Sequence, residues 1–434
     1  MGDKGVEVDR AAPVSKVPLQ ATYRTLPWVI LGILSASLFY TYFLQTAIAP
    51  ILPLVQAEFD LSFSMAGILV SAYFFASAFA QIPSGILADR YSPHKIVVVA
   101  LTMFLSATAL FVLIPQPLVA IAARAIMGFS SGFIFVPSIR AVVAWFEPSK
   151  VGRAVGIIGS SAFAGGSMAN LIMPSMTRAL EAWRPAYSIL VAVGFALPLT
   201  SIIILATLRH VIQIARKSPR GSTKLSESIP TVLRNTVAWR ISLMQFLYFG
   251  AFFGLLSWIP TALISRGTEH LLVSLLSAML PFGAILGFFL SGWMADRIRK
   301  RRPVLTLNLV VFTASTAGLA LLLEGSADPL LVLLPVIFLT GMSWAGNVIN
   351  VIQIADIFPK DRVGTATGVM NAASWMGSTL SPIMIGMILD SGYAFGQAFL
   401  AVAALQIITL ILAVITPETA RGETKSHLPH HHPQ

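Results

Sequence analysis

The chain has 434 residues and a net charge of +11; 56% of its residues are hydrophobic and only 11% are charged. Soluble domains carry about 25% charged residues, and a soluble protein of this length has no way to bury so much apolar surface. The composition therefore indicates a membrane protein whose apolar surface faces lipid. The chain has no cysteine, which excludes disulfides, thiolate metal sites and cysteine nucleophiles.

Residues 1–26 are polar and of mixed charge, and we expect them to form a cytoplasmic tail. The apolar run that follows is too long for a cleavable signal peptide, so the first span should be retained. Apolar runs of roughly 20 residues, the length that crosses a bilayer as a helix, recur along the chain. They predict an all-α membrane protein with twelve transmembrane helices. The predicted spans are 27–53, 64–88, 96–114, 118–143, 154–173, 185–208, 241–263, 271–295, 303–323, 330–354, 364–389 and 395–415.

Lys and Arg residues are concentrated on one side of the predicted bundle. With the N-terminus in the cytoplasm, 25 of the 29 fall on the inner side, and only Arg178, Arg184 and Arg266 fall in outer loops. This asymmetry predicts that both termini are cytoplasmic and that the protein is a multi-pass protein of the cell inner membrane. The basic loops then face anionic membrane lipids, so the positive charge does not indicate a nucleic-acid partner.

A basic polar segment, 209–240, separates the first six spans from the last six. It divides the chain into an N-terminal bundle, 27–208, and a C-terminal bundle, 241–416, which is followed by a cytoplasmic tail, 417–434. A solvated connector and a regulatory or lipid-docking segment both fit the composition of the linker. The His430–His432 tract in the tail could bind metal weakly or be incidental.

The two halves repeat each other in two places. The segment 85–90 (GILADR) matches the segment 292–297 (GWMADR) at an offset of 207. A second match, between the segments that begin at Phe146 and Phe358, has an offset of 212. Repeated six-span halves are a known transporter architecture, with a substrate site near the membrane midplane. The repeat therefore predicts two pseudo-symmetric six-helix bundles.

The repeated segments resemble the loop signature of the major facilitator superfamily, glycine-x-leucine-alanine-aspartate-arginine followed by glycine and basic residues. Ser92 stands where that signature has its later glycine, and Pro93 where it has a basic residue. The resemblance covers all twelve predicted spans. It implies the fold of that superfamily, secondary active transport by alternating access, and a cavity lined by spans one, four, seven and ten.

The acidic residues of the repeat, Asp89 and Asp296, are predicted to lie at cytoplasmic helix ends beside Arg90 and Arg297. The N-termini of spans eleven and five begin at the same face, and a carboxylate near a helix N-terminus is stabilised by about 0.3–1 kcal/mol. We therefore predict that these four residues gate the inner face. Each Asp would latch its half against the other in the outward-open state. The alternative is that they mark turns and anchor the inner face.

Charged residues are rare within the predicted spans, and no Asp or Glu lies in the middle third of any of them. A cationic substrate would need a buried carboxylate, so anions or neutral solutes are favoured. Arg124 in the fourth span is the only deep cation, and intramembrane charges are costly enough to suggest function. Its surroundings resemble a superfamily pattern, arginine-x-x-x-glycine, which implies a role in coupling; a structural hydrogen-bond donor is the alternative. Arg140, nearer the inner end, could attract an anion or snorkel to the interface.

The resemblance also implies that polar and aromatic residues of spans one, four, seven and ten line the substrate cavity. Packing is the alternative for each of them, because polar side chains also join membrane helices through hydrogen bonds. The predicted cavity residues are Tyr40, Gln45, Arg124, Gln245, Tyr248, Trp344, Asn347 and Asn350.

The predicted function is secondary active transport of a small solute, an organic anion of the carboxylate type, with proton symport or exchange. Multidrug efflux is an alternative, but Ser160 replaces the proline that the drug-antiporter signature of the fifth span requires. A non-transporting receptor on the same scaffold is another. An enzyme should show clustered His, Asp or Glu at a membrane face, so we expect no enzyme, and no cofactor or metal site. We expect a monomer.

Overall fold

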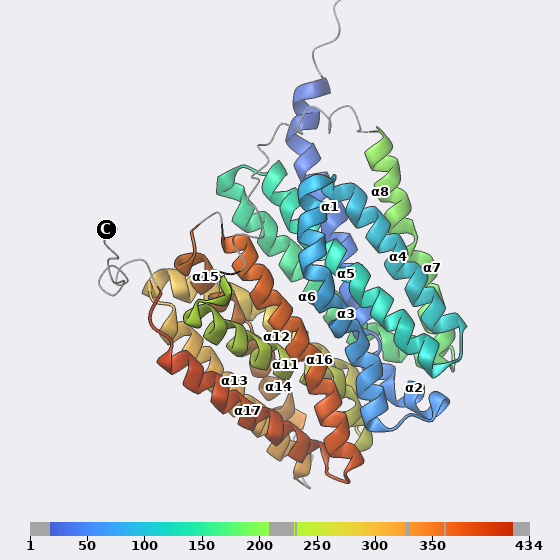
Figure 1. Cartoon of the computed structure of the whole chain (residues 1–434). Coiled ribbons are helices and arrows are strands. Elements are labelled where there is room, and N and C mark those ends of the chain that lie inside the picture. The colour runs from blue at the N-terminus through green and yellow to red at the C-terminus, as the bar shows by residue number, and fades with distance from the viewer. Residues whose placement is uncertain (1–17, 208–229, 231, 326–329, 360–361, 420–434) are drawn as a thin grey trace, which may run out of the picture.

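The structure is a computed structural model that describes residues 18–207, 230, 232–325, 330–359 and 362–419. Every regular element in these ranges is a helix, and twelve helical segments within them are long and apolar enough to cross a membrane. The predicted all-α fold with twelve transmembrane helices is confirmed (Figure 1). Much of the predicted linker and of the two predicted tails lies outside the described residues.

Helices dominate because the lipid core offers the backbone no hydrogen-bond partners, so each span must satisfy its own N–H and C=O groups. The first six spans comprise α1 (Pro18–Thr46), η1 (Ala49–Ile51), α2 (Leu52–Phe59), α3 (Phe63–Arg90), α4 (Pro93–Leu113), α5 (Pro117–Trp145), α6 (Pro148–Ala179), α7 (Trp183–Gly194) and α8 (Ala196–Thr207). The last six comprise α11 (Thr236–Ser265), α12 (His270–Ile298), α13 (Arg302–Glu324), α14 (Leu330–Trp344), α15 (Asn347–Ile357), α16 (Val363–Asp390) and α17 (Phe395–Ile415).

Three of the spans are broken, which their apolar patterns did not predict. The first bends after α1, where Pro50 has no N–H to donate and a 3-10 turn leads into α2. The sixth is interrupted between α7 and α8, and the tenth between α14 and α15. The first helix also begins earlier than expected, at Pro18, so residues 18–26 of the predicted tail are helical.

The two halves pack alike. In the first half α5 packs against α3 and α1 against α6; in the second, α14 packs against α12 and α11 against α16. The same glycine contact recurs: a Cβ on Gly128 would lie 1.9 Å from the backbone oxygen of Tyr73, and one on Gly341 would lie 1.8 Å from that of Leu280. Tyr73 and Leu280 are separated by the repeat offset of 207. The predicted pseudo-symmetry is confirmed.

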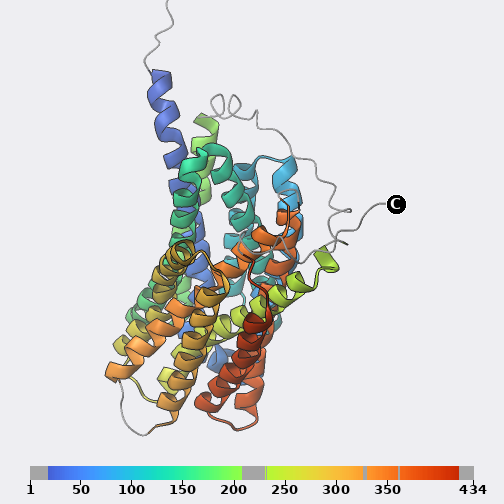
Figure 2. The ribbon, with the colours of Figure 1, turned by 90° about the vertical axis from the view of Figure 1, so that its left-hand side faces the viewer.

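The bundle has two ends, which we name by the segments found there. The linker end holds Thr207 and Thr236, the helix residues that flank the segment between the halves, and the distal end holds Phe63, Ser265 and Asp390. The linker end is uppermost in Figure 1. Figure 2, turned by 90°, shows the helices running between the same two ends.

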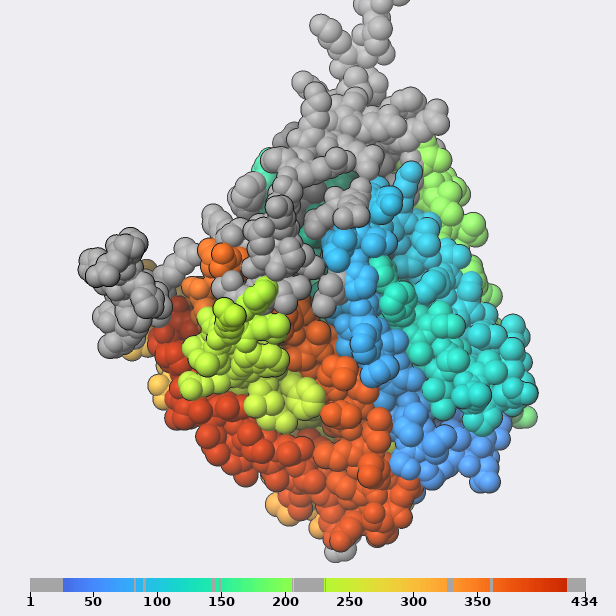
Figure 3. Space-filling view, viewed as in Figure 1, coloured from blue at the N-terminus to red at the C-terminus, as the bar shows by residue number. Residues whose placement is uncertain are grey.

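The halves meet along two helix pairs, α3 with α16 and α6 with α12. In the first pair, the Ser71 hydroxyl donates to the backbone oxygen of Thr379 at 2.6 Å, and the rings of Phe74 and Trp375 stack with centroids 5.9 Å apart. These residues lie near the middle of their helices or on the distal side of it. Figure 3 shows the α3 region in blue against α16 in orange. The halves are therefore in contact from the distal end to the middle of the bundle.

Candidate functional site

Arg124 lies inside the N-terminal half, on α5, and is only 1% exposed. Its Nη1 donates to the backbone oxygen of Gln45 on α1 at 3.5 Å. Its guanidinium carbon lies 5.1 Å from the ring centroid of Tyr73 on α3. Three helices of one half therefore surround this cation.

The end of α1 explains why a backbone oxygen is available to Arg124. The last four carbonyls of a helix have no donor within the helix, and α1 ends at Thr46. Two of these carbonyls accept hydrogen bonds from other helices: Gln45 O from Arg124, and Leu44 O from the Tyr187 hydroxyl at 2.5 Å. Buried side-chain donors thus take the place of the missing N–H groups.

The guanidinium of Arg124 is only partly satisfied. Its Nε and Nη2 are buried and make no hydrogen bond within the described part of the chain, and the same holds for Gln45 Oε1. The salt bridges found among the described residues do not include Arg124. Two nitrogens of a buried cation are therefore available to an oxyanion.

A second polar group lies in the C-terminal half, around the break in the tenth span. Asn350 Nδ2 donates to Gln245 Oε1 at 2.9 Å, and the Tyr248 hydroxyl donates to the backbone oxygen of Ser343. Asn347 Nδ2 donates to the last carbonyl of α14 at 3.0 Å. The break frees carbonyls for side-chain donors, as the end of α1 does in the other half. Asn350 Oδ1 is buried without a hydrogen-bond partner among the described residues.

Trp344, the last residue of α14, is the centre of an aromatic cluster to which both halves contribute. Its ring stacks on Phe252 with centroids 3.8 Å apart, and it lies 5.1 Å from Phe249 and 5.8 Å from Phe288. Phe163, on α6 of the other half, lies 5.5 Å away. Trp344 Nε1 is buried and makes no hydrogen bond within the described ranges. The rings fill the middle of the interface, and the indole N–H is available to donate a hydrogen bond to a bound ligand.

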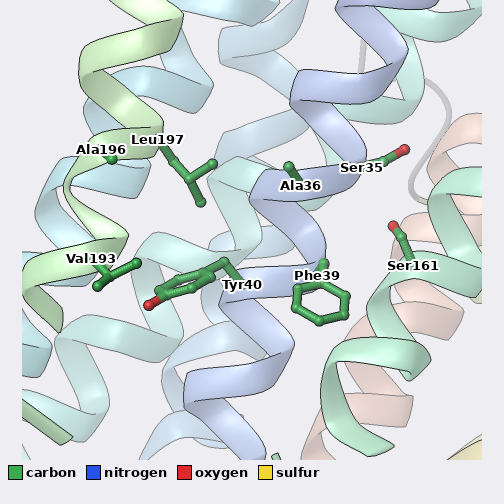
Figure 4. A pocket seen from close by; sticks show the side chains of 8 residues that line it. All are labelled: Ser35, Ala36, Phe39, Tyr40, Ser161, Val193, Ala196 and Leu197. Atoms are coloured by element: carbon green, nitrogen blue, oxygen red, sulfur yellow. The ribbon is translucent and has the colours of Figure 1, made fainter. Parts of the chain in front are cut away.

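Tyr40 lies apart from these groups. It lines an apolar groove of about 450 Å³ between α1, α6 and the junction of α7 with α8 (Figure 4). Its hydroxyl donates to the backbone oxygen of Leu190. No hydrogen bond or ring contact found among the described residues joins Tyr40 to Arg124 or to Gln245. The groove is lined by Ser35, Ala36, Phe39, Tyr40, Ser161, Val193, Ala196 and Leu197.

The predicted gate residue Asp296 is exposed at the linker end of α12. Its carboxylate lies 3.9 Å from Arg301 Nη1, and Arg301 Nε lies 3.2 Å from the carboxylate of Asp356 at the end of α15. Glu418, beyond α17, accepts hydrogen bonds from the backbone N–H groups of Arg301 and Arg302 at 2.8 and 3.1 Å. These contacts all lie within the C-terminal half.

The other predicted gate residues are placed as follows. Arg297 lies over the ring of Trp293 in the same helix, with its guanidinium carbon 5.7 Å from the ring centroid. Asp89 and Arg90 are the last residues of α3, and their side chains lie outside the described part of the chain. The gating role of all four residues stays a prediction.

Two residues that contribute to these sites were missed in the sequence: Tyr73 beside Arg124 and Phe163 opposite Trp344. An aromatic residue in an apolar span most often packs in a core, so neither ring stood out. Gly128, four residues after Arg124, indicates in the sequence that another helix approaches closely there, and the structure shows that its partner is the backbone of Tyr73.

The chain is similar to several curated transporters over most of its length. It is 26% identical to the probable sulfoacetate transporter of Cupriavidus necator, over 92% of this chain and 98% of that protein. It is 26% identical to the gentisate transporter of Corynebacterium glutamicum, over 82% of this chain and 80% of that protein. It is 23% identical to the hexuronate transporter of Bacillus subtilis, over 86% of this chain and 90% of that protein.

The fold of this chain is also found in solved structures. The crystal structure of a bacterial homolog of the human lysosomal transporter Spinster, in an inward-facing and occupied conformation, superposes with a TM-score of 0.69 at 18% identity. The match covers 91% of this chain and 97% of that chain. The profile of the Major Facilitator Superfamily matches residues 34–354 and 271–432. The chain is a multi-pass membrane transporter that belongs to the Major Facilitator Superfamily.

Proposed function

We propose that this transporter carries a small organic anion of the carboxylate type by alternating access. The observation that carries the proposal is Arg124, a buried guanidinium with two nitrogens that make no hydrogen bond among the described residues. A carboxylate or sulfonate matches a guanidinium in charge and in its paired hydrogen-bond geometry. An anionic substrate would satisfy both nitrogens at once.

The buried charge of Arg124 is best compensated by an opposite charge that arrives with the substrate. An arginine within a membrane span is costly, by about 2.5–3.5 kcal/mol at the centre of a helix, and the described residues give Arg124, seven residues after the start of α5, no carboxylate to offset this. A cation held unpaired in this way is costly for the empty carrier. It becomes favourable when an anion binds, because the opposite charges interact strongly at low dielectric.

The relatives support an anion as the cargo. The three compared above are named as transporters of sulfoacetate, gentisate and hexuronate, and each of these compounds carries an acidic group that is ionised at neutral pH. The same names favour anion transport over multidrug efflux for this chain.

We further propose that the linker end faces the cytoplasm, with both termini cytoplasmic, in the cell inner membrane. Basic residues gather at that end: Arg299, Lys300 and Arg301 lie between α12 and α13, and Arg302 is the first residue of α13. Positive residues in short loops favour the cytoplasmic side. In this orientation the contact between α3 and α16 closes the outer side of the carrier.

The test of the proposed cargo is uptake into proteoliposomes of labelled sulfoacetate, gentisate and a hexuronate, each supplied alone. The wild-type protein is expected to accumulate at least one of them, and Arg124→Gln to accumulate none. Partial recovery in Arg124→Lys would indicate that charge suffices, and no recovery that the planar fork is needed. Arg140→Gln, which removes an exposed arginine from the same helix, tests the alternative that the arginine nearer the inner end attracts the anion. Normal accumulation by a well-folded Arg124→Gln contradicts the proposal.

The same vesicles separate the means of coupling. Proton symport predicts uptake that follows an imposed pH gradient, whereas exchange predicts uptake that needs the anion inside. Binding without uptake under either condition identifies a receptor. A latch at the linker end predicts that Asp89→Asn lowers uptake without weakening binding, and unchanged uptake leaves that residue as a turn marker.

A further inference from the structure

One carboxylate at the distal end joins the two halves of the protein. Asp390 is the last residue of α16, in the C-terminal half. Its Oδ1 accepts a hydrogen bond from the backbone N–H of Phe63 at 2.8 Å, and its Oδ2 accepts one from the backbone N–H of Ser64 at 2.9 Å. Phe63 and Ser64 are the first two residues of α3, in the N-terminal half. A single side chain therefore bridges the two bundles.

The start of α3 is suited to hold this carboxylate. The first N–H groups of a helix have no acceptor within the helix. Ser62 satisfies one of them by accepting from the N–H of Met65 at 3.2 Å, and Asp390 accepts from two others. A negative charge is also favoured at a helix N-terminus, and hydrogen bonds to a charged acceptor are about twice as strong as neutral ones.

The carboxylate lies on a close contact between the halves. The ring of Phe63 packs 5.9 Å from that of Trp258 and 6.2 Å from that of Phe395, both in the opposite half. A Cβ on Gly386 would lie 2.4 Å from the backbone oxygen of Phe63. Opening the distal end between α3 and α16 must break both hydrogen bonds and separate these rings.

The α3–α16 and α6–α12 contacts are related by the repeat, and only the first has an acidic residue at this position. The repeat offset of 212 relates Asp390 to Arg178, in the last turn of α6. α6 packs against α12 as α16 packs against α3. The pseudo-symmetric position thus carries the opposite charge, so an acid is not a general requirement at the end of such a helix.

We propose that Asp390 is a gating residue that latches the distal end closed. Its hydrogen bonds to α3 stabilise the state seen in this structure and are absent from the state that is open at the distal end. The proposal rests on alternating access, and in the orientation proposed above the distal end is the outer gate. It does not depend on the identity of the substrate.

The experiment exploits the lack of native cysteine. Ser71 is 2% exposed and lies on the α3–α16 contact, so the thiol of Ser71→Cys reacts with a maleimide only when that contact opens. Labelling of purified protein in detergent makes the assay independent of orientation and of substrate. In this background, Asp390→Asn and Asp390→Ala are expected to raise the labelling rate at least about fivefold, which corresponds to ~1 kcal/mol. Asp390→Glu, which keeps the charge, should restore part of the protection.

Two controls decide between a latch and general loosening. Asp60→Asn removes an exposed acid at the same end, at a residue with positive φ (51°) that Asn tolerates, and should leave the labelling rate unchanged. Ser138→Cys places a thiol at a fully buried position of α5 (0% exposed), away from the α3–α16 contact. Unchanged labelling of Ser71→Cys in both Asp390→Asn and Asp390→Ala overturns the proposal. An equal rise at Ser138→Cys overturns it as well, because it shows a loss of stability rather than the release of a latch.

Discussion

Replacing Arg124 by methionine should abolish anion uptake and, at the same time, stabilise the folded protein. Methionine keeps a long apolar side chain, so little cavity is left beside Tyr73 and the cost of an empty volume is small. The substitution removes a charge that is 1% exposed and has two unsatisfied nitrogens. The opposite signs of the two effects are what distinguish a binding group from a structural one.

The magnitude follows from the contacts of Arg124. The substitution removes one hydrogen bond at the long distance of 3.5 Å, worth about 1 kcal/mol, and a cation–π contact worth about 0.5–1 kcal/mol. It also removes the cost of an unpaired buried charge, which is about 2.5–3.5 kcal/mol for an arginine at the centre of a membrane helix. The net expectation is a stabilisation of roughly 0.5–2 kcal/mol from these terms. For a chain of 434 residues this energy corresponds to an increase of roughly 0.5–2 °C in Tm, because the entropy of unfolding grows with chain length.

The assay is thermal unfolding of the purified protein in one detergent, with wild type, Arg124→Met and Arg140→Met measured together. Arg140 is exposed on the same helix, so Arg140→Met reports the effect of removing an arginine that is not buried. A clear fall in the Tm of Arg124→Met refutes the reasoning. It would show that the guanidinium holds the end of α1 in place, which was the structural alternative.

Two further predictions concern orientation and packing. Reporter fusions within the linker at Ser222 and after Thr419 should both report a cytoplasmic location, and a signal from the other side at either point contradicts the orientation proposed for the linker end. Gly128→Leu should prevent accumulation of folded protein, because its Cβ would lie 1.9 Å from the backbone oxygen of Tyr73. Gly156→Leu should be tolerated, because a Cβ there meets nothing within 4 Å; equal folded yields from the two variants contradict the packing argument.

The twelve helices could be predicted because each follows from a local property of the sequence. Lipid forces every apolar run of sufficient length into a helix, and the GILADR and GWMADR repeats relate the two halves. The breaks in the first and tenth spans could not be predicted in the same way. Pro50 marks the first break, but a proline within an apolar run is tolerated in other helices of this chain, such as Pro83 in α3.

The candidate site was predictable only in part. Arg124 stood out because a charge within an apolar span is rare, and its partners did not, because they are a backbone oxygen and a ring on other helices. Gln245 and Asn350 were placed on two cavity-lining spans by family resemblance, and the structure joins them by a hydrogen bond. Asp390 gave no signal, because charged residues are ordinary at helix ends and its partner Phe63 lies 327 residues away in the chain.

The paired glycine contacts have a consequence for how this sequence can change over time. Where Gly128 meets Tyr73 and Gly341 meets Leu280, the neighbours are backbone oxygens, which no substitution in the partner helix can make smaller. A larger residue at either glycine therefore cannot be compensated by a second substitution in the partner helix. The rings around Trp344 contact one another through side chains, so a smaller ring on one helix can be matched by a larger one opposite. Substitutions that change substrate specificity should therefore occur mainly between the halves, while the glycine contacts inside each half are retained.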